Sequence, residues 1–310
     1  MRIAIIGQQD FGKTVLDAFL ARGDEVAGVF CAPDKEGAKA DPLKVAAQQK
    51  NLMLFQFPSL KSREALEAMR GLNADLGIMA YVLQFAPQDF VTIPRKGTIQ
   101  YHPSLLPKHR GPSSINWPII KGETKTGLSI FRPTDGLDEG PVILQMETPI
   151  NPDDTLGSIY FDRLFPMGIQ AMLKAADLVM AGKHRETVQD ENQASYEGWC
   201  RAAEARIYWH NHVDCIYNLI RGCNPAPGAW TTFAGKKIQL FDSRKHLSRT
   251  FSSVKGKPGE VSEIGSDSIH ITAQGGRIEV FKLKAEDSKK MSAVEFVKET
   301  GLCAGTLFGN

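Results

Sequence analysis

The first 130 residues alternate between two hydrophobic patterns. Short, nearly continuous apolar runs predict strands at 2–7, 25–30, 76–81, 97–102 and 127–132. Apolar residues at helical spacing between several of these runs predict helices at 12–23, 40–51 and 61–72. Buried strands that alternate with helices are typical of a mostly parallel sheet covered on both faces. We therefore predict a Rossmann-like α/β domain, whose ligands bind beyond the carboxyl ends of the strands.

The pattern changes in the middle of the chain. Residues 148–183 form a long stretch of apolar residues at helical spacing, with acidic residues near its start and Gly182 near its end. Pro166 lies inside this stretch, so we expect either a kinked helix or two helices. Residues 183–205 are polar and weakly patterned, which is typical of a linker between domains.

The C-terminal third contains one helical stretch, at 213–223, followed by short strand-length runs separated by glycine-bearing turns. These runs lie at 228–235, 236–243, 259–265, 268–274 and 276–283. Their close spacing predicts a small antiparallel domain, either a sandwich or an OB-like β-barrel. We therefore expect a larger domain at 1–182, a linker at 183–205 and a smaller domain at 206–310.

Composition narrows the class of protein. Hydrophobic residues make up 42% and charged residues 23% of the chain, which is typical of a folded globular protein. The N-terminal apolar run is too short for a signal sequence, and no stretch approaches the roughly 20 apolar residues of a membrane helix. We expect a cytoplasmic protein without a membrane partner. The five cysteines are scattered and lack C-x-x-C spacing, so neither a disulfide framework nor a zinc site is predicted.

Charge is unevenly distributed along the chain. The net charge is only +2, but from Arg201 onward 16 lysines and arginines face 11 acidic residues. This excess is a mild indication of an anionic partner for the C-terminal part. A solvated, lysine-bearing surface is the simpler explanation.

The glycines after the first strand do not indicate a nicotinamide site. Gly7 and Gly12 are five residues apart and do not form the G-x-G-x-x-G pattern of dinucleotide-binding domains. A tight turn from strand to helix explains them better. We therefore expect no nicotinamide cofactor.

His102 is the first candidate for chemistry. It ends the predicted strand 97–102, at the edge where an α/β sheet places its site. Imidazole titrates near neutral pH, so it can accept a proton or offset a developing negative charge. Taken alone, a histidine at the end of a strand is more often a hydrogen-bonded structural residue.

Asp138 is the second candidate. It lies between Gly136 and Gly140, in a loop that joins strand 127–132 to another strand-like run. Alone, it resembles an ordinary turn aspartate. Paired with His102 at one edge of the sheet, it can orient water or take its proton, while the imidazolium offsets charge on a carbonyl oxygen.

These residues also carry a family resemblance. The segments "YHPSLLPKHRGPSSINWPIIKG" and "GLSIFRPTDGLDEGPVI", in which Asp138 lies 36 positions after His102, resemble the 10-formyltetrahydrofolate-dependent formyltransferases. Within that family the chain is most similar to the N-terminal hydrolase domain of 10-formyltetrahydrofolate dehydrogenase. This similarity includes "IAIIGQQDFG", "PDKEGAKADPL", "LFPMGIQ" and "IRGCNPAPGAW".

The resemblance implies a formyltransferase catalytic domain that binds 10-formyltetrahydrofolate and needs no metal. It implies that His102 and Asp138 act on the formyl group and that the Ser104 loop borders the cleft. It implies that the pterin lies against Ala80, Tyr81, Val82, Leu83, Gln84 and Phe85 and against Asp135, Gly136 and Leu137. The family usually has asparagine where this chain has Gln100, whose amide sits on a stem one methylene longer. Either the backbone compensates or the amide no longer reaches the formyl oxygen.

The resemblance leaves the acceptor open. Release of the formyl group to water, giving tetrahydrofolate and formate, is the first expectation, and transfer to another acceptor or a carrier protein is the second. The dehydrogenase's carrier and aldehyde-dehydrogenase domains do not follow within these 310 residues, so full dehydrogenase activity is not expected of this chain.

Methionyl-tRNA formyltransferase is the main alternative, because it shares the domain plan and the donor. Its basic insertion corresponds here to residues 31–44, in which acidic and basic side chains balance. They are Asp34, Glu36 and Asp41 against Lys35, Lys39 and Lys44. Phosphate binding requires clustered bases, so tRNA is disfavoured but remains open.

Two further classes and one possible metal site carry less weight. A folate-binding sensor with a decayed site is disfavoured because both His102 and Asp138 are present. A sugar-amine formyltransferase is disfavoured by the dehydrogenase-like C-terminal stretch. His210 and His212 lie close to Asp214, but without a second ligand cluster we expect a surface or domain-junction role for them.

Overall fold

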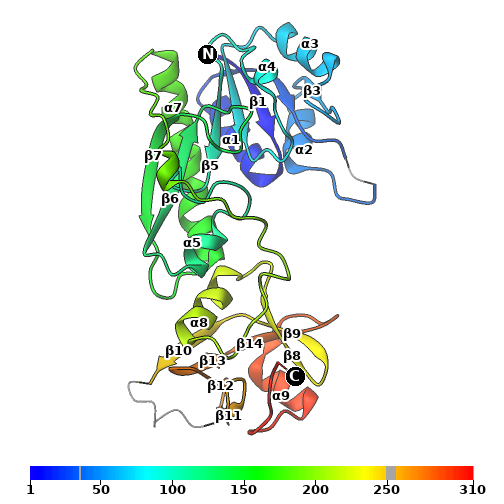
Figure 1. The fold of residues 1–310 in the computed structure, drawn as a ribbon. Helices are drawn as coiled ribbons and strands as arrows, with labels where there is room; N and C mark the ends of the chain where they lie inside the picture. The colour runs from blue at the N-terminus through cyan, green and yellow to red at the C-terminus, as the bar shows by residue number, and fades with distance from the viewer. Residues whose placement is uncertain (35, 249–255, 310) are drawn as a thin grey trace. The chain divides into compact units, whose positions relative to one another are not determined.

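The computed structural model describes residues 1–34, 36–248 and 256–309, which form two compact units (Figure 1). Unit 1 comprises residues 1–111, 127–148 and 163–196. Unit 2 comprises residues 112–126, 149–162 and 197–310. The units are therefore interleaved in the sequence. Lys35, one of the bases in the loop at 31–44, lies outside the described residues.

Residues 183–196 belong to unit 1, although the sequence predicts a linker there. Thr187 and Val142 exchange two backbone hydrogen bonds of 2.8 and 2.9 Å, and Arg110 N donates to Ser195 O at 2.9 Å. These bonds hold the segment against the body of unit 1. The remaining residues of the predicted linker, 197–205, belong to unit 2.

Unit 1 is built on a seven-stranded sheet in the order β3-β2-β1-β4-β5-β6-β7 (Figure 1). The strands are β1 Arg2–Gly7, β2 Glu25–Phe30, β3 Leu54–Phe55, β4 Leu76–Ala80, β5 Thr98–His102, β6 Lys125–Phe131 and β7 Val142–Pro149. Strands β1 to β5 pair in parallel, and β6 pairs antiparallel to β5. The mostly parallel, Rossmann-like sheet predicted from the sequence is confirmed.

Helices cover both faces of this sheet, because the strand side chains alternate. Ile3 and Ile5 of β1 pack in one core with residues of α1, α2 and α7, whereas Ala4 and Ile6 pack in the other with residues of α3 and α4. The helices are α1 Gln9–Ala21, α2 Pro42–Gln49, α3 Arg63–Gly71, α4 Gln88–Val91 and α7 Phe165–Met180, with a 3₁₀ turn, η2, at Glu191–Gln193. None of the helices in the described part of the chain combines the length and apolar character that spanning a bilayer requires.

The break expected around Pro166 is present. Helix α6 (Leu156–Ile159) is followed by a π-helical turn, η1 (Tyr160–Leu164), and α7 then begins at Phe165. Pro166 is the second residue of α7 and has no N–H to donate to the turn before it. The helical run is therefore continuous from Leu156 to Met180, and the π-helical turn interrupts its α-helical part just before Pro166.

Unit 2 contains the antiparallel strands expected of the C-terminal part. They form two four-stranded sheets, β10-β13-β12-β11 and β15-β14-β9-β8. The strands are β8 Ala229–Phe233, β9 Lys236–Leu240, β10 Ser243–Leu247, β11 Val261–Ile264, β12 Ile269–Ala273, β13 Gly276–Val280, β14 Lys282–Ala285 and β15 Met291–Ser292. The helices of this unit include α5 Asn116–Ile120, α8 Val213–Gly222 and α9 Ala293–Thr300.

The chain passes twice between these two sheets. β9 leads into β10 and β13 leads into β14, and the backbone pairs across this corner through Phe241 N to Lys282 O (3.0 Å) and Phe281 N to Asp242 O (2.8 Å). This arrangement is compatible with the barrel-like domain predicted from the sequence, but the two sheets do not close into a single barrel.

Gly7 allows a close approach between two strands. A Cβ atom at this position would lie 2.2 Å from Ala80 O, at the adjoining end of β4. We expect Gly7→Ala to lower the free energy of unfolding by about 1–3 kcal/mol, because backbone must move. Gly71→Ala in α3 is the matched control, since its Cβ would meet nothing within 4 Å. Urea unfolding measures both, and equal stability of the two variants would contradict this role for Gly7.

The thiol of Cys31 is expected to react more slowly than the thiols of Cys215 and Cys303. Burial, followed by the nearby carboxylate of Asp41, raises the pKa of Cys31 to about 12, so it stays protonated at pH 8. Cys215 and Cys303 are exposed. We expect iodoacetamide at pH 8 to alkylate these two in the native protein well before Cys31, as quantified by peptide mass spectrometry. Denatured protein is the control, and equally fast native labelling of Cys31 would contradict the prediction.

Candidate active site

The two residues singled out by the sequence lie together in unit 1. His102 is the last residue of β5, and Asp138 lies in the loop between β6 and β7. His102 Nδ1 is 3.5 Å from Asp138 Oδ2, and the two side chains are only 7% and 10% exposed. The predicted pair is therefore assembled at the carboxyl end of a parallel strand, where α/β sheets bind their ligands.

Asp138 is held in an unusual backbone conformation. Its φ is +55°, in the left-handed region that aspartate and asparagine tolerate better than most residues. The backbone N–H of Gly111 donates to Asp138 Oδ2 at 2.9 Å. The carboxylate is therefore fixed in position from two sides, by Gly111 and by His102.

The contacts of His102 define which ring nitrogen faces the carboxylate. His102 Nε2 lies 2.8 Å from the carbonyl oxygen of His109. A carbonyl oxygen only accepts, so Nε2 carries a hydrogen and donates it. Nδ1 then faces Asp138 Oδ2. Either Nδ1 or Oδ2 must carry a hydrogen for the two atoms to attract each other. Both ring nitrogens thus have partners within the chain, and the imidazole holds Asp138 in place.

A buried hydrogen-bond network that the sequence does not predict lies behind Asp138. Gln189 Nε2 donates to Asp138 O at 2.8 Å and to Gly140 O at 2.7 Å. Its Oε1 accepts from Arg110 Nε at 3.1 Å and from Nη2 at 2.9 Å. One amide therefore ties the backbone of the Asp138 loop to a buried arginine.

Arg110 anchors this network. Its side chain is fully buried and makes hydrogen bonds to both carboxylate oxygens of Glu191, at 2.9 and 2.6 Å, and to Tyr196 Oη. The hydrogen-bonded carboxylate of Glu191 raises the pKa of Arg110 above its ordinary value, so the guanidinium stays charged. The sequence presents Arg110 as one member of a basic loop and Gln189 as part of a polar linker, so neither carries a recognisable signal.

Large apolar side chains are exposed in the segments predicted to hold the pterin. They are Tyr81, Leu83, Phe85 and Leu137, with exposed fractions of 42 to 57%. Gln88 N, at the start of α4, donates to Asp135 Oδ1 at 2.9 Å, which ties the segment after β4 to the loop after β6. Apolar side chains exposed next to a buried polar pair are typical of a ligand-binding surface.

Several other predicted binding residues serve the scaffold in this structure. Ala80 is buried, and Val82 packs against the core formed with α3 and α4. Gln84 donates its amide to Phe57 O at 2.9 Å. Ser104 is fully buried and donates its hydroxyl to Lys108 O at 2.7 Å, so this side chain holds its own loop and is not presented to a ligand.

Gln100 and Gly136, two of the residues predicted to contact the substrate, lie where a ligand can reach them. Gln100 lies two residues before His102 on β5, so it is on the same face of the sheet, and it is partly exposed. Gly136 lies in the Asp138 loop and offers only its backbone. Outside the site, His212 caps the N-terminus of α8 through Nδ1, which accepts from Asp214 N at 3.3 Å.

Comparison with known proteins places this chain in a family. A model of the formyl transferase family matches residues 1–175, and a model of the formyl transferase C-terminal domain matches residues 200–301. The chain is 39% identical over 307 residues to the mitochondrial 10-formyltetrahydrofolate dehydrogenase of Mus musculus, covering 96% of this chain and 33% of that protein. It therefore spans about a third of the length of such relatives.

Two further proteins are similar over nearly the whole chain. A methionyl-tRNA formyltransferase of Syntrophus aciditrophicus is 33% identical over 312 residues, covering 99% of this chain and 98% of that enzyme. The crystal structure of HypX from Aquifex aeolicus in complex with tetrahydrofolic acid has the same fold, with a TM-score of 0.66 and 20% identity, over 96% of this chain and 47% of that chain. From the two matched domains and these relatives, the chain belongs to the formyltransferase family.

Proposed function

We propose that this protein uses 10-formyltetrahydrofolate and releases the formyl group to water, giving tetrahydrofolate and formate. The observation that carries the proposal is the 3.5 Å approach of His102 Nδ1 to Asp138 Oδ2, at the carboxyl end of a parallel strand. Support comes from the relatives, one of which is a 10-formyltetrahydrofolate dehydrogenase and another of which binds tetrahydrofolic acid.

Asp138 is the proposed base. Hydrolysis needs water to attack the formyl carbon, a group to remove the water proton, and a proton on N10 as the carbon–nitrogen bond breaks. The Asp138 carboxylate takes the water proton and returns it to N10. His102 holds this carboxylate through Nδ1 and, when protonated, offsets negative charge in the transition state.

Gln100 is the proposed donor to the formyl oxygen. Both ring nitrogens of His102 already face partners, whereas the Gln100 amide lies on the same face of β5, two residues earlier. An amide N–H aimed at a developing oxyanion contributes about 10²- to 10³-fold to turnover in known enzymes. The longer glutamine stem places this donor differently from the family's usual asparagine.

The folate ring system is proposed to lie against the exposed apolar side chains beside this pair. Tyr81, Leu83, Phe85 and Leu137 provide the apolar surface, and Asp135, Gly136 and the backbone of 80–85 provide polar groups. Ser104 is not included, because its hydroxyl is buried and bonded to Lys108 O. Neither a metal nor a nicotinamide cofactor is required by this chemistry.

Methionyl-tRNA formyltransferase is the second candidate, favoured by a relative of that name that matches along its whole length. The loop at 31–44 argues against it. Lys44 pairs with Asp34, and Asp41 caps α2 by accepting from Leu43 N at 2.9 Å. A loop whose acidic and basic residues balance, and in which Lys44 is paired with Asp34, offers little attraction to phosphates.

A formate-release assay tests the proposal. Purified protein is incubated with 10-formyltetrahydrofolate, with and without methionine-charged initiator tRNA, and formate, tetrahydrofolate and formyl-methionyl-tRNA are measured. We expect formate and tetrahydrofolate in equal amounts without tRNA. Formylated tRNA with no formate in its absence would favour the second candidate. Folate binding without turnover under all conditions would indicate a non-catalytic sensor, or an acceptor such as a sugar amine or carrier protein.

A further inference from the structure

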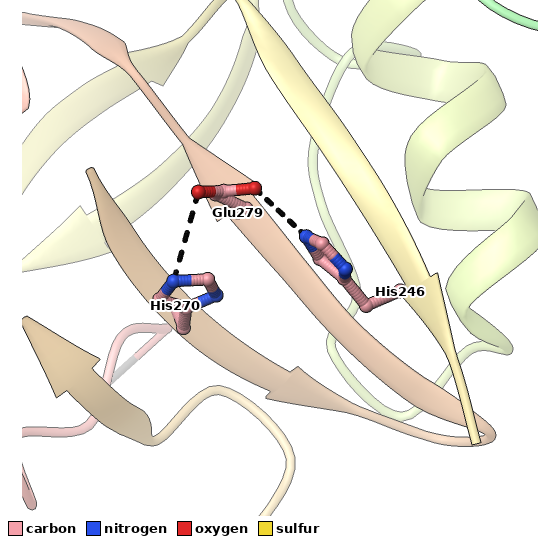
Figure 2. Close-up of side chains that lie close together, drawn as sticks. All are labelled: His246, His270 and Glu279. Atoms are coloured by element: carbon pink, nitrogen blue, oxygen red, sulfur yellow. Dashed lines mark hydrogen bonds and ion pairs between the residues drawn. The ribbon is translucent and has the colours of Figure 1, made fainter. Parts of the chain in front are cut away.

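We propose that His246, His270 and Glu279 of unit 2 form a binding site for one divalent transition-metal ion with the ligand preferences of Zn²⁺. In Figure 2 the two imidazoles approach the Glu279 carboxylate from the neighbouring strands on either side. The site lies on the sheet β10-β13-β12-β11 and is independent of the proposed formyl chemistry.

Strand register brings the three side chains to one face of this sheet. His270 of β12 pairs directly with Glu279 of β13. His246 of β10 pairs with Arg277, two residues before Glu279, so His246 and Glu279 are diagonal neighbours on the same face. The alternate residues on β12 and β13, Ile269, Ile271, Ile278 and Val280, belong to the hydrophobic core on the opposite face.

The three groups are close to coordination distance without an ion. His246 Nε2 is 2.8 Å from Glu279 Oε2, and His270 Nε2 is 3.7 Å from Glu279 Oε1. One donor atom from each residue can be chosen so that all lie within 4.8 Å of one another. Ligands of a tetrahedral zinc ion, each about 2.0 Å from the metal, are roughly 3.3 Å apart. A small inward movement therefore converts the cluster into a three-ligand site.

The buried ring of His270 is incompletely hydrogen-bonded, and its Nε2 faces the Glu279 carboxylate without reaching it. Its side chain is only 9% exposed, yet Nδ1 has no hydrogen-bond partner within the described part of the chain. Nε2 points toward Glu279 but is too far away for a hydrogen bond. Buried polar atoms are almost always hydrogen-bonded, because leaving one unpaired costs free energy. A metal ion between Nε2 and the carboxylate would give Nε2 a strong partner, and Nδ1 would keep the hydrogen of the ring.

The surroundings favour an ion of the zinc type. Ser268 Oγ donates to Glu279 Oε1 at 2.8 Å and orients the carboxylate, as outer partners of metal ligands do. Two cations lie on neighbouring positions. Arg277 is paired with Glu263 at 3.1 Å, and Arg244, opposite Glu279 in the strand register, lies over the Phe281 ring with its Cζ 5.3 Å from the ring centre. His246 is 42% exposed, which leaves a side open for the ion and a water ligand. Two imidazoles and one carboxylate suit zinc, cobalt or nickel, whereas calcium and magnesium prefer oxygen ligands.

Metal binding changes where the histidine hydrogens lie, but it does not oxidise or reduce any group. Each ligating Nε2 gives up its hydrogen and donates its lone pair to the ion. The ring then carries its hydrogen on Nδ1, or releases a proton if it was charged.

Metal titration tests the site. Chelator-treated protein is titrated with Zn²⁺ in competition with a chromophoric chelator at pH 7.5, and with Co²⁺ while the visible spectrum is followed. We expect one zinc equivalent and the visible bands of a low-symmetry cobalt site. His246→Ala and His270→Ala should each weaken zinc binding at least tenfold, whereas His210→Ala, at an exposed histidine, should not change it.

Folding of the variants is checked by circular dichroism and by thermal unfolding with and without zinc. Zinc should raise the Tm of the unaltered protein but not that of His246→Ala. If His270→Ala does not fold, two other variants decide the test: His246→Ala, at a partly exposed position, and Glu279→Gln, which keeps the size of the side chain. Absence of a zinc equivalent in the unaltered protein, or His246→Ala binding zinc as tightly as that protein, would overturn the proposal.

Discussion

Asp138→Asn is expected to lower formate release from 10-formyltetrahydrofolate by about 10²- to 10⁴-fold, the usual contribution of a general base. The amide has nearly the size of the carboxylate but cannot take a proton from water. Asparagine also tolerates the left-handed backbone of this position, at φ +55°, and its oxygen can still accept from Gly111 N. Alanine is the poorer choice, because it adds backbone strain to the loss of the carboxylate.

The measurement compares turnover with folate binding. Formate release is followed at saturating substrate, and tetrahydrofolate affinity is measured by fluorescence titration. We expect binding within a few-fold of the unaltered protein, because the apolar side chains of the folate surface are unchanged. Asp89→Asn, at an exposed position in the first turn of α4, is the control and should retain full activity. A turnover of Asp138→Asn similar to that of the control would remove Asp138 from the mechanism.

The parts of the fold that depend on local pattern could be predicted from the sequence. Buried strands separated by helical stretches specify a parallel sheet, and the last residue of such a strand lies at the binding edge. Which segments of the chain make up each of the two units could not be predicted in this way. Asn116 of α5, for example, donates to Gly222 O at 2.8 Å across 106 positions of sequence. A hydrogen bond between residues so far apart in sequence cannot be predicted from the spacing of hydrophobic residues.

The same distinction applies to the sites. His102 and Asp138 stand out because each ends or follows a strand at one edge of the sheet. His246, His270 and Glu279 have no motif spacing, and the sequence predicts no metal site. They become neighbours only because β13 lies between β10 and β12. The Ser104 hydroxyl bonds to Lys108 O, as a serine in a loop can bond to nearby backbone.

Gln189 is expected to act as a positioning residue for Asp138. An ionised Gln189→Glu side chain can still accept from Arg110 but can no longer donate to Asp138 O and Gly140 O. One buried and one partly buried carbonyl then lose their donor, so we expect the free energy of unfolding to fall by about 1–3 kcal/mol. We expect kcat to fall by about 10- to 100-fold, because small displacements of a reacting group are costly, while KM changes little.

A double-mutant cycle separates positioning from a general loss of structure. If Gln189 acts through the Asp138 carboxylate, Gln189→Glu should lower kcat in the unaltered protein but have little further effect in Asp138→Asn, because the base is already absent. Gln193→Glu is the matched control, since Gln193 donates to Asp190 Oδ2 at 2.9 Å on the exterior. Equal losses in both backgrounds would mean that Gln189 supports the fold without positioning Asp138. An unchanged kcat in the single variant would exclude the role, because the tether would then have no influence on the carboxylate.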